Sequence, residues 1–284
     1  MLIAQITDIH IGFDKASAEE HNLLRLRGTI ATLCASADRP DLLLLTGDLT
    51  EDGAAEDYAR LVAELAPCPF PVWPLVGNHD RRDELRAAFP QVPPAPDGFV
   101  HYVLDEGPLR VIVLDTLEPG RHGGSFCAER AAWLSGRLAE APARPTLVAL
   151  HHPPFASGIP WMDTVPGEPW VARLAACLAG QDQVVGLVCG HVHRTILSRW
   201  AGLPTLVCPS TAPAVGLELA PIDPDCPDGR RLITDEPPGY ALHRWTGGEL
   251  VSHFGAIGPW LTLARYEEQL QPMIRAMLDE RPAG

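Results

Sequence analysis

Residues 71–80 read Pro-Val-Trp-Pro-Leu-Val-Gly-Asn-His-Asp, an apolar run that ends abruptly in polar side chains. Such a run predicts a buried strand, and Gly77 is where that strand would turn sharply. Asn78 offers an amide oxygen to a hard cation, and His79 offers an imidazole that can hold or deliver a proton. This combination is unusual for a plain loop and predicts a functional site at the end of the strand.

The same pattern recurs at four other places in the chain. The apolar run at 2–7 is followed by Asp8 and His10, and the run at 41–46 by Asp48. The run at 146–150 is followed by His151 and His152, and the run at 184–189 by Gly190, His191 and His193. In open α/β sheets the ligand crevice lies beyond the carboxyl ends of the strands. We therefore expect an α/β fold in which five strands deliver Asp, Asn and His side chains to one edge.

The remaining segments predict helices, a second sheet and a C-terminal extension. Amphipathic helices are expected at 20–36, 54–65, 81–89, 128–140 and 170–178, and further strands at 99–104, 109–114 and 205–208. The runs 240–245 and 249–254 predict a hairpin that turns at Gly247-Gly248. A tail helix is expected at 260–278, where Pro272 should kink it or split it, and it should pack on its own domain or on another subunit.

Composition narrows the class of protein. The chain has 284 residues and a formal net charge of −14, which argues against a nucleic-acid polymer as partner. Its seven cysteines are an odd number without a C-x-x-C pair, as expected for reduced thiols in a cytoplasmic protein. The chain enters an apolar run at Leu2, so no signal peptide is expected, and no run approaches the roughly 20 apolar residues of a membrane span.

Each pair of candidate ligands, taken alone, also has an interpretation that involves no metal. Asp8 and His10 point to the same side of an extended chain and could grip one ion, or they could be a turn carboxylate and a surface histidine. His191 and His193 could contact two adjacent ions, or lie on the surface. Asp, Asn and His together favour Mn, Fe, Zn or Co over Ca, which prefers oxygen ligands alone.

Taken in order, these blocks resemble the calcineurin-like metallophosphoesterases. The matching blocks are Asp8-x-His10, Gly47-Asp48, Gly77-Asn78-His79-Asp80, His151 and Gly190-His191-x-His193. The resemblance implies a four-layer αββα sandwich of two mixed sheets flanked by helices. It assigns residues 1–215 to the catalytic domain and 216–284 to a hairpin and helix appendage, which we expect to complete the second sheet and to form an oligomer interface.

The resemblance also implies roles for individual residues. Asp8, His10 and His193 would bind one divalent ion, Asn78, His151 and His191 would bind a second, and Asp48 would bridge the two. His152 would be left to the core or to the surroundings of the site. His79, which is not a ligand in the family, would assist the leaving group, helped by a carboxylate such as Asp80 or Glu51.

The implied reaction is hydrolysis of a small phosphodiester by in-line attack of a hydroxide that bridges the two ions. Residues 47–53, Gly-Asp-Leu-Thr-Glu-Asp-Gly, depart from the protein-phosphatase branch of the family. Together with Cys208-Pro209-Ser210-Thr211 they are most similar to bacterial class III cyclic-nucleotide phosphodiesterases and glycerophosphodiesterases. Cyclic AMP and glycerophosphodiesters are thus the expected substrates, selected by the loops at 12–20, 121–125 and 155–168.

Other functions are compatible with the same blocks. A nucleotide pyrophosphatase or a DNA exonuclease of the same superfamily would share the metal ligands, although the acidic charge disfavours the exonuclease. A non-catalytic scaffold that binds a protein partner is the alternative from another class. Such a scaffold would be expected to lose ligands or the catalytic histidine, and this chain retains them all. We also expect a homo-oligomer, because the hairpin and tail helix offer an interface.

Overall fold

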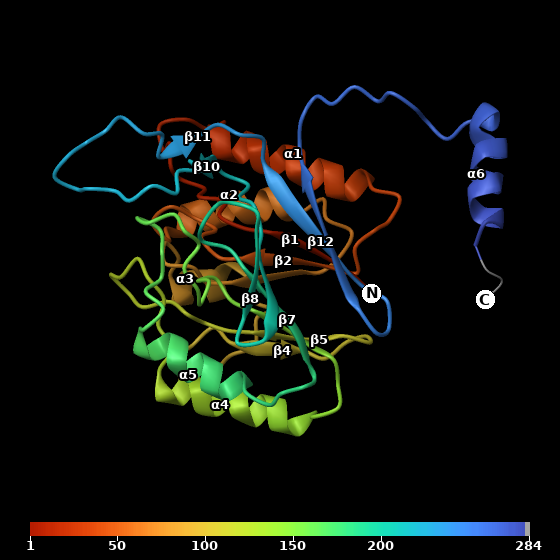
Figure 1. Cartoon of the computed structure of the whole chain (residues 1–284). Helices are drawn as coiled ribbons and strands as arrows, with labels where there is room; N and C mark the ends of the chain where they lie inside the picture. The colour runs from red at the N-terminus through yellow and green to blue at the C-terminus, as the bar shows by residue number, and fades with distance from the viewer. Residues whose placement is uncertain (282–284) are drawn as a thin grey trace.

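Two mixed β-sheets lie face to face in the computed structural model, which describes residues 1–281 (Figure 1). The first sheet has the order β13-β12-β1-β2-β3, with β1 at Leu2–Ile6, β2 at Leu42–Thr46, β3 at Val72–Leu75, β12 at Gly239–Trp245 and β13 at Leu250–Ala256. The second has the order β4-β5-β6-β7-β9-β8, with β4 at Tyr102–Leu104, β5 at Arg110–Val113, β6 at Thr146–Ala149, β7 at Val184–Cys189, β8 at Ile196–Trp200 and β9 at Leu203–Val207. A short pair, β10 at Ala214–Val215 and β11 at Ile233–Thr234, lies outside both sheets.

Helices cover the outer faces of the two sheets. They are α1 at His21–Ala35, α2 at Ala55–Leu65, α3 at Arg82–Ala88, α4 at Ala128–Glu140 and α5 at Pro169–Leu178. Leu26 of α1 and Leu61 of α2 pack into the core that contains β1 and β2, whereas Leu134 of α4 and Leu174 of α5 pack into a separate core. Figure 1 shows α4 and α5 on the side of the molecule opposite to α1.

Strand alternation explains the four layers. Successive side chains of a strand point to opposite faces of its sheet. In β5, Val111 and Val113 face the core between the two sheets, whereas Ile112 faces α4 and α5. In β6, likewise, Leu147 faces the core between the two sheets and Val148 faces α4 and α5. Both faces of these strands are buried, which is why they read as continuous apolar runs, and the predicted αββα sandwich is confirmed.

The parallel strands bring their carboxyl ends together. β1, β2 and β3 are parallel to one another, as are β5, β6, β7 and β9. Beyond the strands, Asp8 N–H donates to Gly47 O at 3.0 Å and Gly190 N–H donates to His151 O at 3.0 Å. A Cβ built on Gly190 would lie 2.9 Å from Thr46 O, so the end of β7 in the second sheet touches the end of β2 in the first. Both sheets therefore supply residues to one edge.

The C-terminal hairpin forms as predicted but joins the other sheet. β12 pairs antiparallel with β1, with Leu2 opposite Arg244 and Gln5 opposite Ala241, and β13 pairs with β12. The expectation that the hairpin completes the second sheet was therefore wrong. Amphipathic alternation identifies a strand but not the strand that it pairs with. Here β12 pairs with the edge of β1 that β2 leaves open. The division of the chain after residue 215 stays a prediction.

Two further elements differ from the expectation. The tail helix α6 covers only Gln271–Asp279, after a 3₁₀ turn at Glu268–Leu270, and Pro272 lies in its first turn rather than at a kink. Proline is well tolerated there because the first N–H groups of a helix have no intrahelical partner. Edge strand β8 was not predicted. Within residues 1–281, no helix is both long and apolar enough to cross a membrane.

Candidate metal centre

Asp8, His10 and His193 meet on one side of the shared edge. His10 Nε2 and His193 Nε2 lie 3.3 Å apart, and His193 Nε2 lies 3.5 Å from Asp8 Oδ1. The Nδ1 atoms of both rings are engaged elsewhere, with Glu51 Oε2 at 2.7 Å for His10 and with Pro213 O at 2.9 Å for His193. Fixing Nδ1 in this way orients each ring and leaves Nε2 as the ligand atom. One carboxylate oxygen and two imidazole nitrogens therefore converge on one point.

Asp48 lies between this group and the next. Its Oδ2 is 3.8 Å from His10 Nε2 and 3.2 Å from His151 Nε2. Its Oδ1 accepts a hydrogen bond of 2.8 Å from the backbone N–H of His79. A carboxylate placed between two clusters of ligand atoms is the arrangement expected of a bridging ligand.

Asn78, His151 and His191 form the second group. Asn78 Oδ1, His151 Nε2 and His191 Nδ1 are buried and make no hydrogen bond. His151 Nδ1–H donates to Thr46 O at 2.8 Å, which directs Nε2 toward Asp48 Oδ2 at 3.2 Å, and the Asn78 amide NH₂ faces His122 Nδ1 at 3.5 Å, which leaves Oδ1 free. Buried polar atoms usually have hydrogen-bond partners, so three ligand-type atoms without one in a single pocket fit a cation. The donor set and its burial therefore suit a divalent metal.

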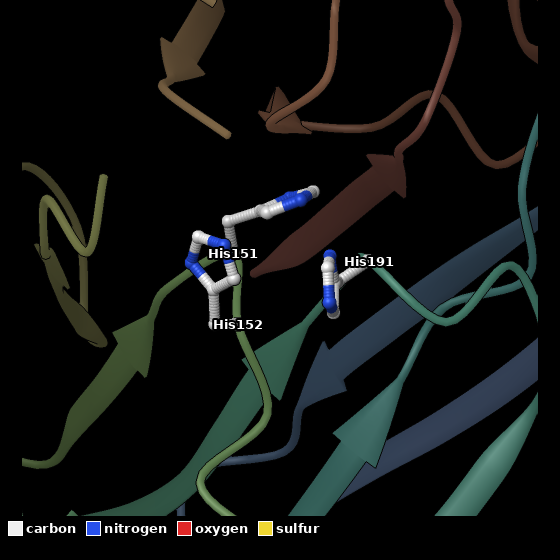
Figure 2. Close-up of side chains that lie close together, drawn as sticks. All are labelled: His151, His152 and His191. Atoms are coloured by element: carbon white, nitrogen blue, oxygen red, sulfur yellow. The ribbon is translucent and has the colours of Figure 1, made fainter. Parts of the chain in front are cut away.

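His152 is beside this group but is not available to it. Figure 2 shows His151 and His152 on the segment that follows β6, with His191 facing them from the end of β7. The ring of His152 lies 4.7 Å from that of His191, yet its Nδ1 contacts Thr116 Oγ1 at 2.8 Å and its Nε2 contacts His122 O at 3.1 Å. Both nitrogens are used, in agreement with the expectation that His152 supports the surroundings of the site.

Backbone strain is concentrated at the predicted ligands. Six non-glycine residues of the described chain have positive φ, and five of them are Asp8 (50°), His10 (52°), Asp48 (50°), His191 (74°) and His193 (56°). Left-handed backbone costs an ordinary residue about 1–3 kcal/mol and persists where the surrounding structure requires it. Here it turns each side chain into the shared pocket directly after a strand.

Three glycines make room for the ligands. A Cβ on Gly77 would lie 2.2 Å from Asp48 Oδ1, and one on Gly47 would lie 2.4 Å from His151 Nδ1. A Cβ on Gly190 would lie 3.0 Å from Asp8 Oδ2. No side chain fits at such distances, so the close approach of the strand ends requires glycine at these positions.

The electrostatics of the pocket favour a cation. Burial works to raise the pKa of the Asp48 carboxyl, but the His151 and His10 rings overcome it and hold that pKa well below its usual value. Burial works to lower the pKa of His151, whereas Asp48 and Asp8 raise it to about 9. Burial lowers the pKa of His191 well below its usual value, so that ring is neutral. Asp48 is therefore an ionised carboxylate and His191 a neutral imidazole, and these are the protonation states in which each side chain binds a divalent metal.

His79 faces a cavity beside the predicted ligands. Its Nδ1–H donates to Glu51 O at 2.8 Å, and Glu51 Oε1 is 3.9 Å away. Of the two carboxylates expected near His79, Glu51 is the one the structure places there. Asp80 is buried and accepts hydrogen bonds from Gly77 N–H (2.9 Å) and Tyr58 O–H (2.7 Å). The cavity measures about 710 Å³, and its charged lining includes Arg81 and Glu51.

His122 and Asn22 contribute to the site without having been predicted, and Glu51 was expected beside His79 but not as a partner of His10. His122 places its ring 4.6 Å from that of His191 and faces Asn78, and Glu51 bonds to His10. Asn22 Nδ2, at the start of α1, donates to His10 O at 3.0 Å. The loop at 121–125 was expected to help select the substrate, and a histidine in that loop was the one sequence feature that could have indicated His122.

Comparisons with known proteins agree with this geometry. The family model described as calcineurin-like phosphoesterase matches residues 1–195. The chain is 30% identical to a probable glycerophosphodiester phosphodiesterase from Arcobacter nitrofigilis, over 91% of this chain and 94% of that protein. It is 34% identical to a probable cyclic nucleotide phosphodiesterase from Rhodopseudomonas palustris (81% and 82%), and 32% identical to the 3′,5′-cyclic adenosine monophosphate phosphodiesterase of Escherichia coli K12 (74% and 75%).

Solved structures with little sequence identity share the fold. A dimetal phosphatase from Danio rerio has a TM-score of 0.61 at 15% identity, over 89% of this chain and 98% of that one. A purple acid phosphatase from yellow lupin has a TM-score of 0.62 at 16% identity, over 93% of this chain and 57% of that one. With a family model that covers more than half of its residues and strands that carry the matching blocks to one edge, the chain belongs to the calcineurin-like phosphoesterase family.

Proposed function

We propose that this protein is a metal-dependent phosphodiesterase that hydrolyses small phosphodiesters. The observation that supports it most is the position of Asp48, whose carboxylate lies 3.8 Å from His10 and 3.2 Å from His151, between two groups of ligand atoms. Relatives over most of the chain carry the names of glycerophosphodiester and cyclic nucleotide phosphodiesterases. Both names describe cleavage of a phosphodiester bond, so the reaction type is shared whichever substrate this chain uses.

Two divalent ions per chain are part of this proposal, chosen from Mn, Fe, Zn and Co. Asp8, His10 and His193 would hold one ion, Asn78, His151 and His191 the other, and Asp48 would contact both. When bound, two such ions would lower the pKa of a water molecule and draw charge from the phosphoryl oxygens. The mixed nitrogen and oxygen donors disfavour Ca.

The chain's own residues would orient the ester and move the proton. The backbone carbonyl of Glu51 holds the ring of His79 and the carboxylate of Asp48 holds its backbone, since His79 Nδ1–H donates to Glu51 O and its N–H donates to Asp48 Oδ1. His79 Nε2 is then free to protonate the leaving oxygen. The water oxygen forms the new bond to phosphorus and loses a proton, the ester P–O bond breaks, and the leaving oxygen takes the Nε2 proton of His79 in its imidazolium form. An acyclic diester then gives a phosphomonoester and an alcohol, and a cyclic diester gives one ring-opened phosphomonoester.

The net charge of −14 favours small diesters over nucleic-acid polymers, because a negatively charged protein repels a phosphate backbone. Cyclic nucleotides such as cyclic AMP and glycerophosphodiesters are therefore the proposed substrates. Retention of His79 and of every predicted ligand supports catalysis over a protein-binding scaffold.

A substrate panel tests the proposal. Metal-loaded enzyme should hydrolyse bis(p-nitrophenyl) phosphate together with cyclic AMP or glycerophosphocholine, and chelation followed by Mn²⁺ should remove and restore that activity. Activity on p-nitrophenyl phosphate alone would overturn the diesterase assignment, and activity on nucleotide pyrophosphates alone would favour the pyrophosphatase. Asp48→Asn should abolish turnover, whereas Asp38→Asn, an exposed change that lies between α1 and the start of β2, and so before the end of that strand that is opposite to Asp48, should not.

We also infer that the protein is a homo-oligomer of the cytoplasm. Trp260, Leu261 and Leu263 are exposed by 68%, 81% and 88%, and α6 stands apart from both sheets in Figure 1. A second subunit that covers this segment would bury apolar area that water now contacts. All seven cysteines, which lie within the described residues, are free thiols, and this supports a reducing compartment.

A further inference from the structure

A second cavity opens beside the metal centre, with a wall that contains His10 and His193 but not His79. It measures about 350 Å³, and carbon atoms form most of its exposed lining, with Phe13, Ala212, Pro213 and Ile233 as its apolar side chains beside His21, Asn22 and Glu51. His10 and His193 are predicted ligands whose Nε2 atoms lie 3.3 Å apart. A phosphate held at the centre would therefore have this cavity directly beside it.

Phe13 is exposed but its backbone is held in place. The side chain is 73% exposed, on the segment between β1 and α1. The buried carboxylate of Glu20 accepts hydrogen bonds from Gly12 N–H (2.9 Å) and Asp14 N–H (3.0 Å), on either side of Phe13. An aromatic ring presented to water from a fixed backbone loses little entropy when a ligand covers it.

The opposite wall is fixed by one buried arginine. Arg25 of α1 donates to Thr211 O at 2.7 Å, to Ala212 O at 3.1 Å and to Glu236 O at 2.7 Å. It also pairs with Asp235 at 2.8 Å. These bonds hold the segment around Ala212 and the end of β11 against α1. The cavity is therefore a preformed feature of the fold, as ligand pockets usually are.

The cavity on the His79 side differs from this one in size and in the charge of its lining. It is about twice as large, at about 710 Å³ against about 350 Å³, and its lining carries charged side chains such as Asp52, Arg81 and Glu84. Glu51 lines both cavities and so marks the boundary between them. A diester held at the centre thus has a charged cavity on one side and an apolar cavity on the other.

A phosphodiester has two ester groups, one that leaves and one that stays on phosphorus. Under the proposed function, His79 serves the leaving oxygen, so the leaving alcohol belongs in the charged cavity. We infer that the apolar cavity beside His10 and His193 receives the ester group that stays on phosphorus, and that this group carries an aromatic or apolar ring. Phe13 and Ile233 are then specificity residues that select the retained group.

Two substrates with one leaving group test this inference. Bis(p-nitrophenyl) phosphate and methyl p-nitrophenyl phosphate both release p-nitrophenol but retain an aryl and a methyl group respectively. Phe13→Ala should raise KM for the bis-aryl ester by about fivefold or more, as loss of an apolar contact to a ring predicts, and change KM for the methyl ester less than about twofold. Ile233→Ala should act in the same direction, and both residues are exposed enough for the variants to fold.

A binding measurement separates the inference from turnover. In calorimetry on the metal-loaded protein, Phe13→Ala should weaken phenylphosphonate by about the same factor and leave methylphosphonate unchanged. Leu197→Ala, at a 69% exposed position on edge strand β8, is the matched control and should change nothing. Equal losses for the aryl and methyl ligands, or no loss for either, would overturn the inference. If wild-type protein cleaves neither ester, the proposed function fails, and the phosphonates still decide the cavity.

Discussion

At the scale of single residues, His79 is held so that one nitrogen is left for chemistry. Its backbone N–H donates to Asp48 Oδ1 and its Nδ1–H donates to Glu51 O, both at 2.8 Å, while its side chain remains 32% exposed to the larger cavity. A group that is anchored at the site and still reaches the cavity can deliver a proton without being a ligand.

His79→Ala should lower kcat by about 10²–10⁴-fold, the usual contribution of a general acid, with metal content unchanged at about two per chain. The loss should be greater for release of glycerol than of p-nitrophenol, because p-nitrophenolate leaves without a proton. Rate measurements with metal analysis check both points, and His253→Ala, an exposed histidine of β13, serves as control. Loss of metal from the His79 variant would show that it is a ligand.

Gly77→Ala should damage the site without unfolding the protein. The added Cβ would lie 2.2 Å from Asp48 Oδ1, so the carboxylate must move away from its place between the two ligand groups. We expect at least a tenfold loss of metal affinity in a calorimetric titration, in the range seen when support of a ligand is removed.

The matched control is Gly136→Ala in α4, where no atom lies within 4 Å of the new Cβ. It should raise the free energy of unfolding by about 0.5–1 kcal/mol, because alanine has the higher helix propensity, and leave metal binding alone. Equal metal affinity in the Gly77 variant and wild type would contradict the steric argument.

Residue types at the site were predictable, but their conformations were not. Asp, Asn and His after apolar runs identified all seven predicted ligands, because strand ends are readable from sequence. The left-handed backbone of Asp8 and His191 was not readable, since neither is glycine. His122 was missed because its contact with Asn78 depends on the path of a loop, which hydrophobic periodicity does not describe.

At the scale of elements, β12 ties the C-terminal hairpin to the first sheet through a buried histidine. His243 Nε2–H donates to Gln5 Oε1 at 2.9 Å, and Ser252 of β13 contacts His243 Nδ1 at 2.8 Å. Gln5 in turn donates to Thr46 Oγ1 at 2.8 Å at the end of β2. The neutral imidazole is therefore part of a hydrogen-bonded chain across four strands, β13, β12, β1 and β2.

This histidine should make the fold sensitive to acid. Burial lowers the pKa of His243 to about 4. Between about pH 6.5 and about pH 4 this histidine is therefore protonated in the unfolded chain but neutral in the folded chain. The free energy of unfolding should fall by about 2 kcal/mol through this group between pH 7.5 and 5. Urea denaturation should show a smaller acid loss in His243→Gln than in wild type. The same acid loss in both proteins would contradict this prediction.

Elements were predicted where their hydrophobic pattern was strong. α4 and β7 match their predicted bounds, because both have an unambiguous apolar pattern. β8 was missed because Ile196–Trp200 is an edge strand that exposes Leu197 and Arg199, so its pattern resembles a loop. The hairpin was assigned to the wrong sheet because pairing is decided by the tertiary neighbour, which the pattern does not name.

At the scale of the whole molecule, the described residues beyond β13, 257–281, contribute no buried side chain to the core. No residue of η1 (Glu268–Leu270) or α6 is buried, and Tyr266 is 69% exposed. A helix of nine residues is too short to be stable alone in water, so its apolar residues need a partner surface. The proposed oligomer supplies it.

Truncation after residue 257 should therefore separate subunits without unfolding them. The hairpin, which ends at Ala256, is retained. In analytical ultracentrifugation the full chain should sediment as a dimer or larger assembly and the truncated chain as a monomer. The urea midpoint of the isolated subunit should not change. A monomeric full chain, or a truncated chain that unfolds, would contradict the proposed interface.

The proposed mechanism requires two ions that share Asp48, and anomalous diffraction from crystals soaked in Mn²⁺ tests this requirement most directly. We expect two manganese peaks roughly 3.5–4 Å apart, one beside Asp8, His10 and His193 and the other beside Asn78, His151 and His191, with the Asp48 carboxylate touching both. A single peak, or a pair of peaks that Asp48 does not join, would contradict it.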